Sequence, residues 1–334
     1  MDTALVTGAA GFIGSHLVEG LRTRGYRVRG FDNCSSGDRS RLDGVWADED
    51  FEFVEGDVRD ERAVRETMEG VDVVFHHAAD TSVPASFDRL AWVTDVNCTG
   101  TATVLEAARE AGVDSLVFAS SASVYGSDVS PPTPEDAPLR PESPYALSKR
   151  YGEDLLDIAD GDGGGDDDEG SDGDGSGDAD SDDENGLDAV AVRYFNVYGP
   201  GQDPSGPYAA VIPAFVERLL AGDPPVIYGD GGQTRDFVHV ADVVDATIRA
   251  AERDCSGPIN VGNGQRTSIH ELATTLRDIL GVDVEPELAP PREGDVRHSG
   301  ADITRAREQL DFEPSVGLRE GLENTVEAYR DDRV

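Results

Sequence analysis

Basic side chains are scarce in this chain, and lysine is almost absent. The 334 residues include 68 acidic and only 28 basic side chains, which gives a formal net charge of −40, and Lys149 is the only lysine. Proteins that bind nucleic acid through general electrostatics need many lysines and arginines, so this class is excluded. The same shortage argues against docking on an anionic membrane surface. We expect no nucleic-acid partner and no membrane partner.

Cysteine and long apolar segments are also scarce. The three cysteines, Cys34, Cys98 and Cys255, are scattered and odd in number, so they predict neither a disulfide framework nor a metal site. No apolar run approaches the roughly 18 residues that span a membrane. The chain opens on MDTALVTGAAGFIG, without the basic and apolar regions of a secretory signal. We therefore expect a cytoplasmic protein that holds no metal.

The acidity extends over the whole chain. Thirteen acids fall between Asp160 and Glu184, a segment without a base, and the other 55 still outnumber the 28 bases. Such a charge surplus destabilises a compact state unless salt screens the repulsion, so we expect a halophilic protein from a cell that accumulates molar salt. The stretch at about 160–186 has Ala179 as its lone apolar side chain, which predicts a disordered acidic insertion.

Short apolar runs alternate with amphipathic stretches through the first half of the chain. The runs typical of buried strands are Ala4–Thr7, Tyr26–Phe31, Phe51–Glu55, Val71–His76 and Ser115–Ala119. Buried strands separated by helices predict a doubly wound parallel sheet in a Rossmann-like α/β fold. We expect this domain over residues 1–195, with about 237–263 returning to it. A smaller, mostly C-terminal substrate-binding lobe is expected over 196–236 and 264–331.

A glycine-rich turn after the first predicted strand indicates a dinucleotide site. Gly8, Gly11 and Gly14 allow a tight turn and close backbone approach, and the following helix directs its amino end at a pyrophosphate. Asp32 ends the second strand, 18 residues past Gly14, where a carboxylate accepts the hydroxyls of the adenosine ribose. A carboxylate there repels a 2′-phosphate, which favours NAD over NADP. Asp57 ends the third strand and is expected at the adenine edge.

Tyr145 and Lys149 lie four residues apart in YALSK, so a helix places them on one face. A free tyrosine has a pKa of about 10, and a nearby ammonium together with a positive nicotinamide ring lowers it. We expect Tyr145 to act as a base, with Lys149 lowering its pKa, while hydride leaves the same carbon for NAD. Keeping lysine at this single position supports the assignment, because arginine does not replace a compact ammonium. Ser121, after the fifth strand, is expected to hydrogen-bond the reacting oxygen.

The motifs together resemble those of a known family. TGAAGFIGSHL, FHHAA, FASSASVYG, YALSK, RYFNVYGPGQDP and YGDGGQTRDFVHVADV follow the order seen in extended short-chain dehydrogenase/reductases, and specifically in NAD-dependent nucleotide-sugar epimerases. The resemblance spans nearly the whole chain and implies the same fold, NAD as cofactor and a UDP-sugar as substrate. It also implies a homodimer formed by the helices after Asn97 and through Tyr145–Lys149.

The resemblance also implies roles for individual residues. Lys149 matches the lysine that binds the nicotinamide ribose, and Asn196 matches an asparagine near the substrate diphosphate. Arg235 and Arg292 match arginines that bind the UDP portion, and Asp295 a carboxylate near its ribose. Residues in matching positions that are expected to line the cofactor are Phe12, Ile13, Asn33, Val58, Ala78 and Ala79. Further residues expected near the substrate are Ser123, Tyr208, Ala209, Val211, Ile212 and Ser299.

Relatives of this kind catalyse several reactions that begin with oxidation at the sugar C4. Ala122 and Ser123 stand where 4,6-dehydratases carry an Asp-Glu pair and decarboxylases usually carry a Glu, so elimination and decarboxylation are disfavoured. Epimerisation needs no further acid–base group. Ser299 stands where relatives restricted to glucose and galactose often have Tyr, which favours UDP-GlcNAc/UDP-GalNAc, alone or beside UDP-Glc/UDP-Gal. The alternatives are a UDP-glucuronate 4-epimerase, another dehydratase, decarboxylase or dehydrogenase, and a non-enzymatic NAD-sensing scaffold.

Overall fold

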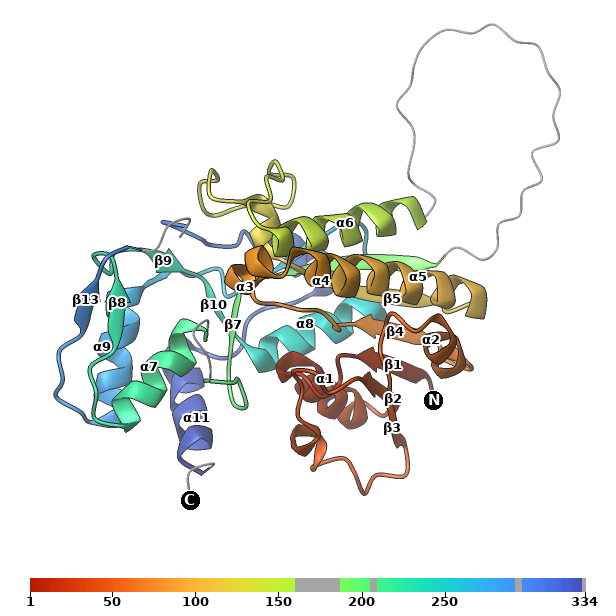
Figure 1. Cartoon of the computed structure of the whole chain (residues 1–334), viewed down its shortest axis with the longest axis horizontal. Coiled ribbons are helices and arrows are strands. Elements are labelled where there is room, and N and C mark those ends of the chain that lie inside the picture. The colour runs from red at the N-terminus through yellow and green to blue at the C-terminus, as the bar shows by residue number, and fades with distance from the viewer. Residues whose placement is uncertain (160–186, 205–208, 292–295, 332–334) are drawn as a thin grey trace, which may run out of the picture.

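A seven-stranded parallel sheet forms the centre of the computed structural model, which describes residues 1–159, 187–204, 209–291 and 296–331 (Figure 1). The predicted disordered insertion lies outside the described residues. The strands are β1 (Thr3–Thr7), β2 (Arg27–Asp32), β3 (Phe51–Glu55), β4 (Val73–His76), β5 (Ser115–Ser121), β6 (Asp188–Tyr194) and β11 (Ile259–Val261). Their order is β11-β6-β5-β4-β1-β2-β3, so the chain reverses direction across the sheet between β1 and β4. In such a sheet the reversal point is where ligands bind.

Helices cover both faces of the sheet, as a doubly wound fold requires (Figure 1). One face carries α1 (Phe12–Thr23) and α8 (Val240–Glu252), whose apolar sides share a core with β1, β5 and β6. The opposite face carries α2 (Glu61–Met68), α5 (Gly100–Ala111) and α6 (Pro144–Ala159), which share a second core with β4 and β5. The predicted Rossmann-like architecture is therefore confirmed.

A third core holds a smaller lobe, seen in Figure 1 beyond the carboxyl ends of the strands. Its helices are α7 (Val211–Leu220), α9 (Ile269–Leu280) and α11 (Leu318–Asp331). Three strand pairs connect them: β7 (Asn196–Tyr198) with β10 (Phe237–His239), β8 (Val226–Tyr228) with β13 (Glu287–Ala289), and β9 (Thr234–Arg235) with β12 (Thr267–Ser268).

One helix of the predicted lobe belongs instead to the sheet domain. The range 264–331 was expected to lie wholly in the lobe, but α10 (Thr304–Leu310) packs on α8 and β11. Ala306 and Leu310 are fully buried in the first core of the Rossmann domain. The correction has a simple cause: a short helix next to β11 covers apolar surface that α8 alone leaves exposed at this end of the sheet. The other domain boundaries stay a prediction.

Two short helices and an irregular turn connect β4 to α5. They are α3 (Val83–Asp88) and α4 (Leu90–Thr94), followed by a π-helical turn over Asp95–Thr99 that runs directly into α5. Asn97 in this turn is buried. Its side-chain oxygen accepts the backbone N–H of Asp80 at 2.8 Å, and its side-chain nitrogen donates to the Asp80 carbonyl at 3.0 Å. It also donates to Ser148 Oγ at 2.9 Å. The π turn thus joins the segment after β4 to helix α6.

Candidate active site

Five predicted residues lie at the same edge of the sheet, because parallel strands in register end together. Gly8 follows β1, Asp32 ends β2 and Asp57 follows β3, while Ala78 follows β4 and Ser121 ends β5. This edge faces the smaller lobe in Figure 1. The carboxyl ends of the strands in open α/β sheets are where ligands bind.

The turn after β1 packs so tightly that two of its positions need glycine. Gly8 has φ +72°, and a Cβ at this residue would lie 2.8 Å from the backbone nitrogen of Ala78. A Cβ at Gly14 would lie 2.0 Å from the carbonyl oxygen of Gly8, so both positions need glycine. Helix α1 begins at Phe12, and no side chain caps its amino end. The backbone N–H groups of the first turn, at Phe12 and Ile13 among others, can therefore bind an anion.

Asp32 is placed to accept hydroxyl groups at the end of β2. It is buried, and its two carboxylate oxygens accept backbone N–H groups from Ala10 at 3.0 Å and Cys34 at 2.7 Å. Burial raises the pKa of Asp32, and these two hydrogen bonds oppose the rise. Each oxygen keeps a second lone pair that can accept a ribose hydroxyl.

Asp57 is held more firmly than the sequence indicates. Arg59 bonds its two carboxylate oxygens at 2.8 and 2.7 Å, and the amide of Asn33 donates to it at 2.9 Å. These bonds hold the pKa of Asp57 well below its usual range. The guanidinium also lies 4.5 Å from the ring centre of Trp92. The neighbouring Val58 packs its buried side chain toward α5, so only its backbone is available to a ligand.

A buried threonine and histidine fix the segment after β4. Thr7 Oγ1 accepts the backbone N–H of His77 at 3.2 Å and of Ala78 at 3.1 Å. The same hydroxyl lies 2.7 Å from Nδ1 of His76, and burial lowers the pKa of this histidine to about 3. The imidazole is therefore neutral near pH 7. Ala78 and Ala79 are half-buried next to the glycine turn, where a ligand in that turn would meet them.

Ser121, Tyr145 and Lys149 come together where α6 packs on β5. Tyr145 and Ser121 share a side-chain hydrogen bond, and Ser121 Oγ also accepts the backbone N–H of Ser123 at 3.2 Å. Lys149 Nζ donates to the carbonyl oxygen of Ala119 at 2.7 Å and lies 5.9 Å from the ring centre of Tyr145. The one lysine of the chain is 4% exposed.

The side chains alone shift the pKa of Tyr145 in the direction opposite to our expectation. Burial raises this pKa, and the hydrogen bond with Ser121 only partly opposes the rise. The sequence predicted that Lys149 lowers it. Lys149 Nζ lies 5.9 Å from the ring centre and donates to the carbonyl oxygen of Ala119. The prediction combined its charge with that of a bound nicotinamide ring, which the protein alone does not supply. In the protein by itself, desolvation of the phenolate is the larger effect.

The residues expected around the substrate divide into several groups. Asn196 begins β7, two residues past Tyr194, which pairs with Ser121 across the sheet. Arg235 and Ser299 lie on adjacent segments, because the backbone N–H of Ser299 donates to the carbonyl of Thr234 at 3.0 Å. A third group lies outside the described residues: Tyr208, Arg292 and Asp295. The remaining expected residues lie at the start of α7 and after β5.

The segment at the start of α7 corrects one expectation. Ala209 and Val211 are half-buried, but Ile212 is 1% exposed and packs in the core of the lobe. Its side chain is therefore part of the lobe's core, so only its backbone is available to a ligand. Ser123, by contrast, has a buried hydroxyl without a hydrogen-bond partner among the described residues. Such a group is expected where a ligand completes the site.

A buried polar network between α6, β5 and β6 was not predicted from the sequence. Glu153 on α6 bonds Arg193 on β6 at 2.6 and 2.9 Å, and Ser120 Oγ donates to the same carboxylate. Arg193 also donates to the hydroxyl of Tyr125 at 2.9 Å. Two signals were available: Arg193 interrupts an apolar strand, and Glu153 lies four residues after Lys149 on the same face.

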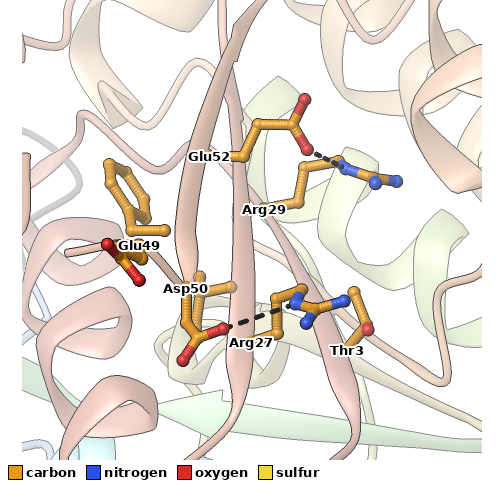
Figure 2. Close-up of a pocket in the computed structure, with 8 residues that line it drawn as sticks. Thr3, Arg27, Arg29, Glu49, Asp50 and Glu52 are labelled. Carbon is orange, nitrogen blue, oxygen red and sulfur yellow. Dashed lines mark hydrogen bonds and ion pairs between the residues drawn. The ribbon is translucent and has the colours of Figure 1, made fainter.

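A separate cavity of about 270 Å³ opens at the opposite edge of the sheet. Figure 2 shows that charged side chains from the start of β2 and β3 line it, with Arg29 bonded to Glu52 at 2.9 Å and Arg27 near Asp50 at 3.6 Å. These residues precede the strand ends that carry the predicted site. Both arginines of its walls already pair with acidic residues, so this cavity gives no candidate for the chemistry.

A family model described as the NAD dependent epimerase/dehydratase family matches residues 4–262. The chain belongs to this family. A UDP-glucose 4-epimerase from Mycolicibacterium smegmatis is 43% identical over 98% of both chains. Other relatives at 32–35% identity are named for UDP-glucuronate 4-epimerisation, for decarboxylation or for 4,6-dehydration.

Solved structures of epimerases share the whole fold. A UDP-glucose 4-epimerase from Thermotoga maritima, solved with UDP-glucose, gives a TM-score of 0.88 at 38% identity and covers 99% of this chain and 100% of its own. A UDP-N-acetylglucosamine 4-epimerase from Methanobrevibacter ruminantium, solved with UDP-N-acetylmuramic acid, gives 0.89 at 34% identity and covers 99% of each chain. This epimerase/dehydratase family member therefore shares the fold of these structures over nearly its whole given length.

The described residues fit the dinucleotide that the family requires. The glycine turn excludes a side chain at Gly14, the amino end of α1 is uncapped, and Asp32 presents a buried carboxylate. These three features suit a pyrophosphate and a ribose diol. The described chain has no group of three or more His, Cys, Asp or Glu side chains that could hold a metal. Within the same residues, no helix is long and apolar enough to cross a membrane.

We predict that Gly14→Ala abolishes NAD binding, because the added Cβ would lie 2.0 Å from the Gly8 carbonyl oxygen and force the turn apart. Gly317→Ala is the control, since a Cβ there meets nothing within 4 Å and the residue has no positive φ. Calorimetric titration with NAD in high KCl measures both. We expect at least about a hundredfold weaker binding for the first variant and no change for the second. Equal affinity in the two variants would contradict this account of the turn.

Proposed function

We propose that the chain is an NAD-dependent 4-epimerase of UDP-hexoses. The observation that carries the proposal is the grouping of Ser121, Tyr145 and Lys149 at the carboxyl end of β5, beside the dinucleotide turn. The names of the Mycolicibacterium and Thermotoga relatives support the same reaction. A scaffold that only senses NAD needs no buried phenol and ammonium on one helix face.

Each of the three side chains has a distinct task in this reaction. The chemistry that NAD supplies when bound is acceptance of a hydride from C4 of the sugar and its return to the opposite face. Tyr145, as phenolate, takes the proton from the C4 hydroxyl and gives it back to the same oxygen after the ketone has turned. Ser121 donates a hydrogen bond to that oxygen, and Lys149 supplies positive charge that stabilises the phenolate.

The residues after Ser121 support epimerisation over elimination. Ala122 and Ser123 form the short 3₁₀ turn that follows β5, and neither carries a group that titrates near neutral pH. A 4,6-elimination requires an acid and a base beside the sugar in addition to Tyr145. Because this turn carries neither group, the transient 4-keto sugar reacts further by accepting the hydride back at C4.

An acetamido sugar is the substrate that we favour. Ser299 is small, half-buried and adjacent to Arg235, so it leaves volume where a tyrosine would fill the site. The name of the Methanobrevibacter structure supports UDP-GlcNAc as the type of substrate. We propose turnover of UDP-GlcNAc/UDP-GalNAc, with UDP-Glc/UDP-Gal as smaller substrates that also fit.

An exposed apolar surface supports a homodimer. Of the eleven large apolar side chains exposed in the described chain, seven lie on α3, α4 and α6: Val83, Phe87, Leu90, Trp92, Leu147, Tyr151 and Ile158. These three helices contact one another, so their exposed residues form one surface. We propose that a second copy of the chain covers it, which also places α6 of each subunit at the interface.

Tyr145→Phe tests the proposed reaction. We expect turnover of UDP-sugars to fall by about a thousandfold, because the base is lost, while NAD binding persists. Tyr151→Phe, on the exposed side of the same helix, is the control that stays active. Proton NMR of UDP-GlcNAc, UDP-Glc and UDP-glucuronate incubated with protein and NAD follows the products. A 4-keto-6-deoxy sugar, a pentose, or net NADH would overturn the epimerase proposal, as would full activity of Tyr145→Phe.

Ser299→Tyr tests the substrate. We expect the larger side chain to abolish turnover of UDP-GlcNAc through overpacking and to leave UDP-Glc within about threefold of wild type. Ser299→Ala keeps the volume small and should retain both activities. Rates with the two substrates, measured in parallel by NMR, give the ratio directly. Equal losses on both substrates in Ser299→Tyr would refute the argument from pocket size.

Leu147→Glu tests the dimer. A carboxylate at the centre of the apolar surface cannot be buried without a partner, so light scattering in molar KCl should show the mass of one subunit. Leu288→Glu, also exposed but on β13 of the lobe, should keep the mass of the wild type. A monomeric wild-type protein would contradict the proposed assembly, and so would a dimeric Leu147→Glu variant.

A further inference from the structure

Helix α6 is joined to the end of β5 at three consecutive strand residues. Tyr145 bonds the hydroxyl of Ser121, Lys149 bonds the carbonyl of Ala119, and Glu153 accepts the hydroxyl of Ser120. The three helix residues are spaced four apart, so they share one face. The proposed reaction uses the first two, and the third lies one turn further along the same face.

Glu153 is too buried to be an incidental surface charge. Its side chain is 6% exposed, and that of Arg193, its partner on β6, is 4% exposed. Arg193 bonds both carboxylate oxygens, and it donates a further hydrogen bond to the carbonyl of Glu135 at 2.8 Å. A buried ion pair adds little net stability over apolar packing of the same volume. Stability alone therefore does not account for this pair.

Glu153 acts electrostatically on Lys149. Burial lowers the pKa of the Lys149 ammonium to about 8, and the carboxylate of Glu153 is the larger of two influences that oppose this. The second comes from Cys98 in the π turn, a thiol whose own pKa burial raises. The geometry agrees, because Glu153 lies one turn after Lys149 on the same face of α6 and the two side chains bond adjacent residues of β5. A buried ammonium depends on such a neighbouring anion for its charge.

The other titratable groups that face Lys149 leave this role to Glu153. His76 and His77, after β4, are both held neutral because burial lowers the pKa of each to about 3. Tyr145, on the same helix, carries a phenol whose pKa burial raises. From β5, Lys149 meets only the Ala119 carbonyl and the ring of Phe118, 4.9 Å away. Arg193 from β6 bonds the Glu153 carboxylate and is not among the charges that influence the pKa of Lys149.

We propose that Glu153 is a positioning residue of the active site. It holds α6 against the end of β5 through its hydrogen bond with Ser120. Its carboxylate, which Arg193 orients, keeps the buried ammonium of Lys149 charged. The inference deepens the proposed function, since Lys149 in turn stabilises the phenolate of Tyr145. Glu153 does not need to contact substrate or cofactor for this role.

The composition of the chain offers a direct test. Lys149 is the only lysine, so protein grown with ¹³C,¹⁵N-lysine gives one side-chain resonance that needs no assignment. Its chemical shift against pH reports the titration of this ammonium without substrate, NAD or turnover. We expect a midpoint near pH 8 in the wild type. In Glu153→Gln, which keeps a hydrogen-bonding side chain of the same size, we expect the midpoint to fall by about one pH unit.

Activity provides the second readout. The alkaline limb of the kcat profile should move to lower pH by the same amount, so kcat at pH values above the midpoint falls about tenfold while KM for the UDP-sugar is unchanged. Asp154→Asn is the matched control. It removes one negative charge from the neighbouring position of α6, but this carboxylate is exposed and only 3.7 Å from Arg150. We expect it to move neither the midpoint nor the kcat profile.

The outcomes separate this inference from the proposed function. A folded Glu153→Gln with an unchanged Lys149 midpoint would overturn the role of Glu153, whatever reaction the chain catalyses. A lowered midpoint in a chain that epimerises no UDP-sugar would support the electrostatic role and contradict the proposed function. Should Glu153→Gln fail to fold because Arg193 loses its counter-charge, the double variant Glu153→Gln/Arg193→Gln removes the pair together. The double variant must also lower the midpoint, and an unchanged value there overturns the proposal.

Discussion

The seating of α6 on the carboxyl end of β5 is the contact on which the rest of this molecule's chemistry depends. Three helix side chains, Tyr145, Lys149 and Glu153, bond three consecutive strand residues. Because the strand is buried up to its last residue and paired on both sides, its end is a rigid platform. A shift of the helix by one residue would break all three bonds. Site geometry built on packed elements in this way is more precise than geometry carried by loops.

Burial at this contact has opposite consequences for its acidic and basic groups. Desolvation raises the pKa of the Tyr145 phenol and lowers that of the Lys149 ammonium, so by itself it disfavours the charged form of both. The proposed base must be charged to act. The site therefore needs hydrogen bonds and opposite charges at short range, and the Ser121 hydroxyl and the Glu153 carboxylate supply them from the protein.

The strands of the first half, the glycine turn and the YALSK helix were all predictable, because each depends on local spacing. Period-two and period-3.6 patterns report burial along single elements, and glycine at three fixed positions reports a turn that excludes a Cβ. The placement of α10 was not predictable in this way, since its seven residues carry no signal for which core they join. The burial of the Ile212 side chain was not predicted for the same reason: an apolar residue beside a ligand and one in a core have the same chemistry.

The sequence by itself determined the doubly wound sheet, the dinucleotide turn and the pairing of Tyr145 with Lys149, because these follow from residues that are neighbours along the chain or along one helix. Only the tertiary structure decided the partners of the buried charges. Arg193 and Glu153 lie 40 residues apart and meet because β6 pairs with β5 beneath α6. The balance of charge around Lys149 depends on such long-range contacts, since desolvation and Coulomb attraction act through space, whatever the order of residues along the chain.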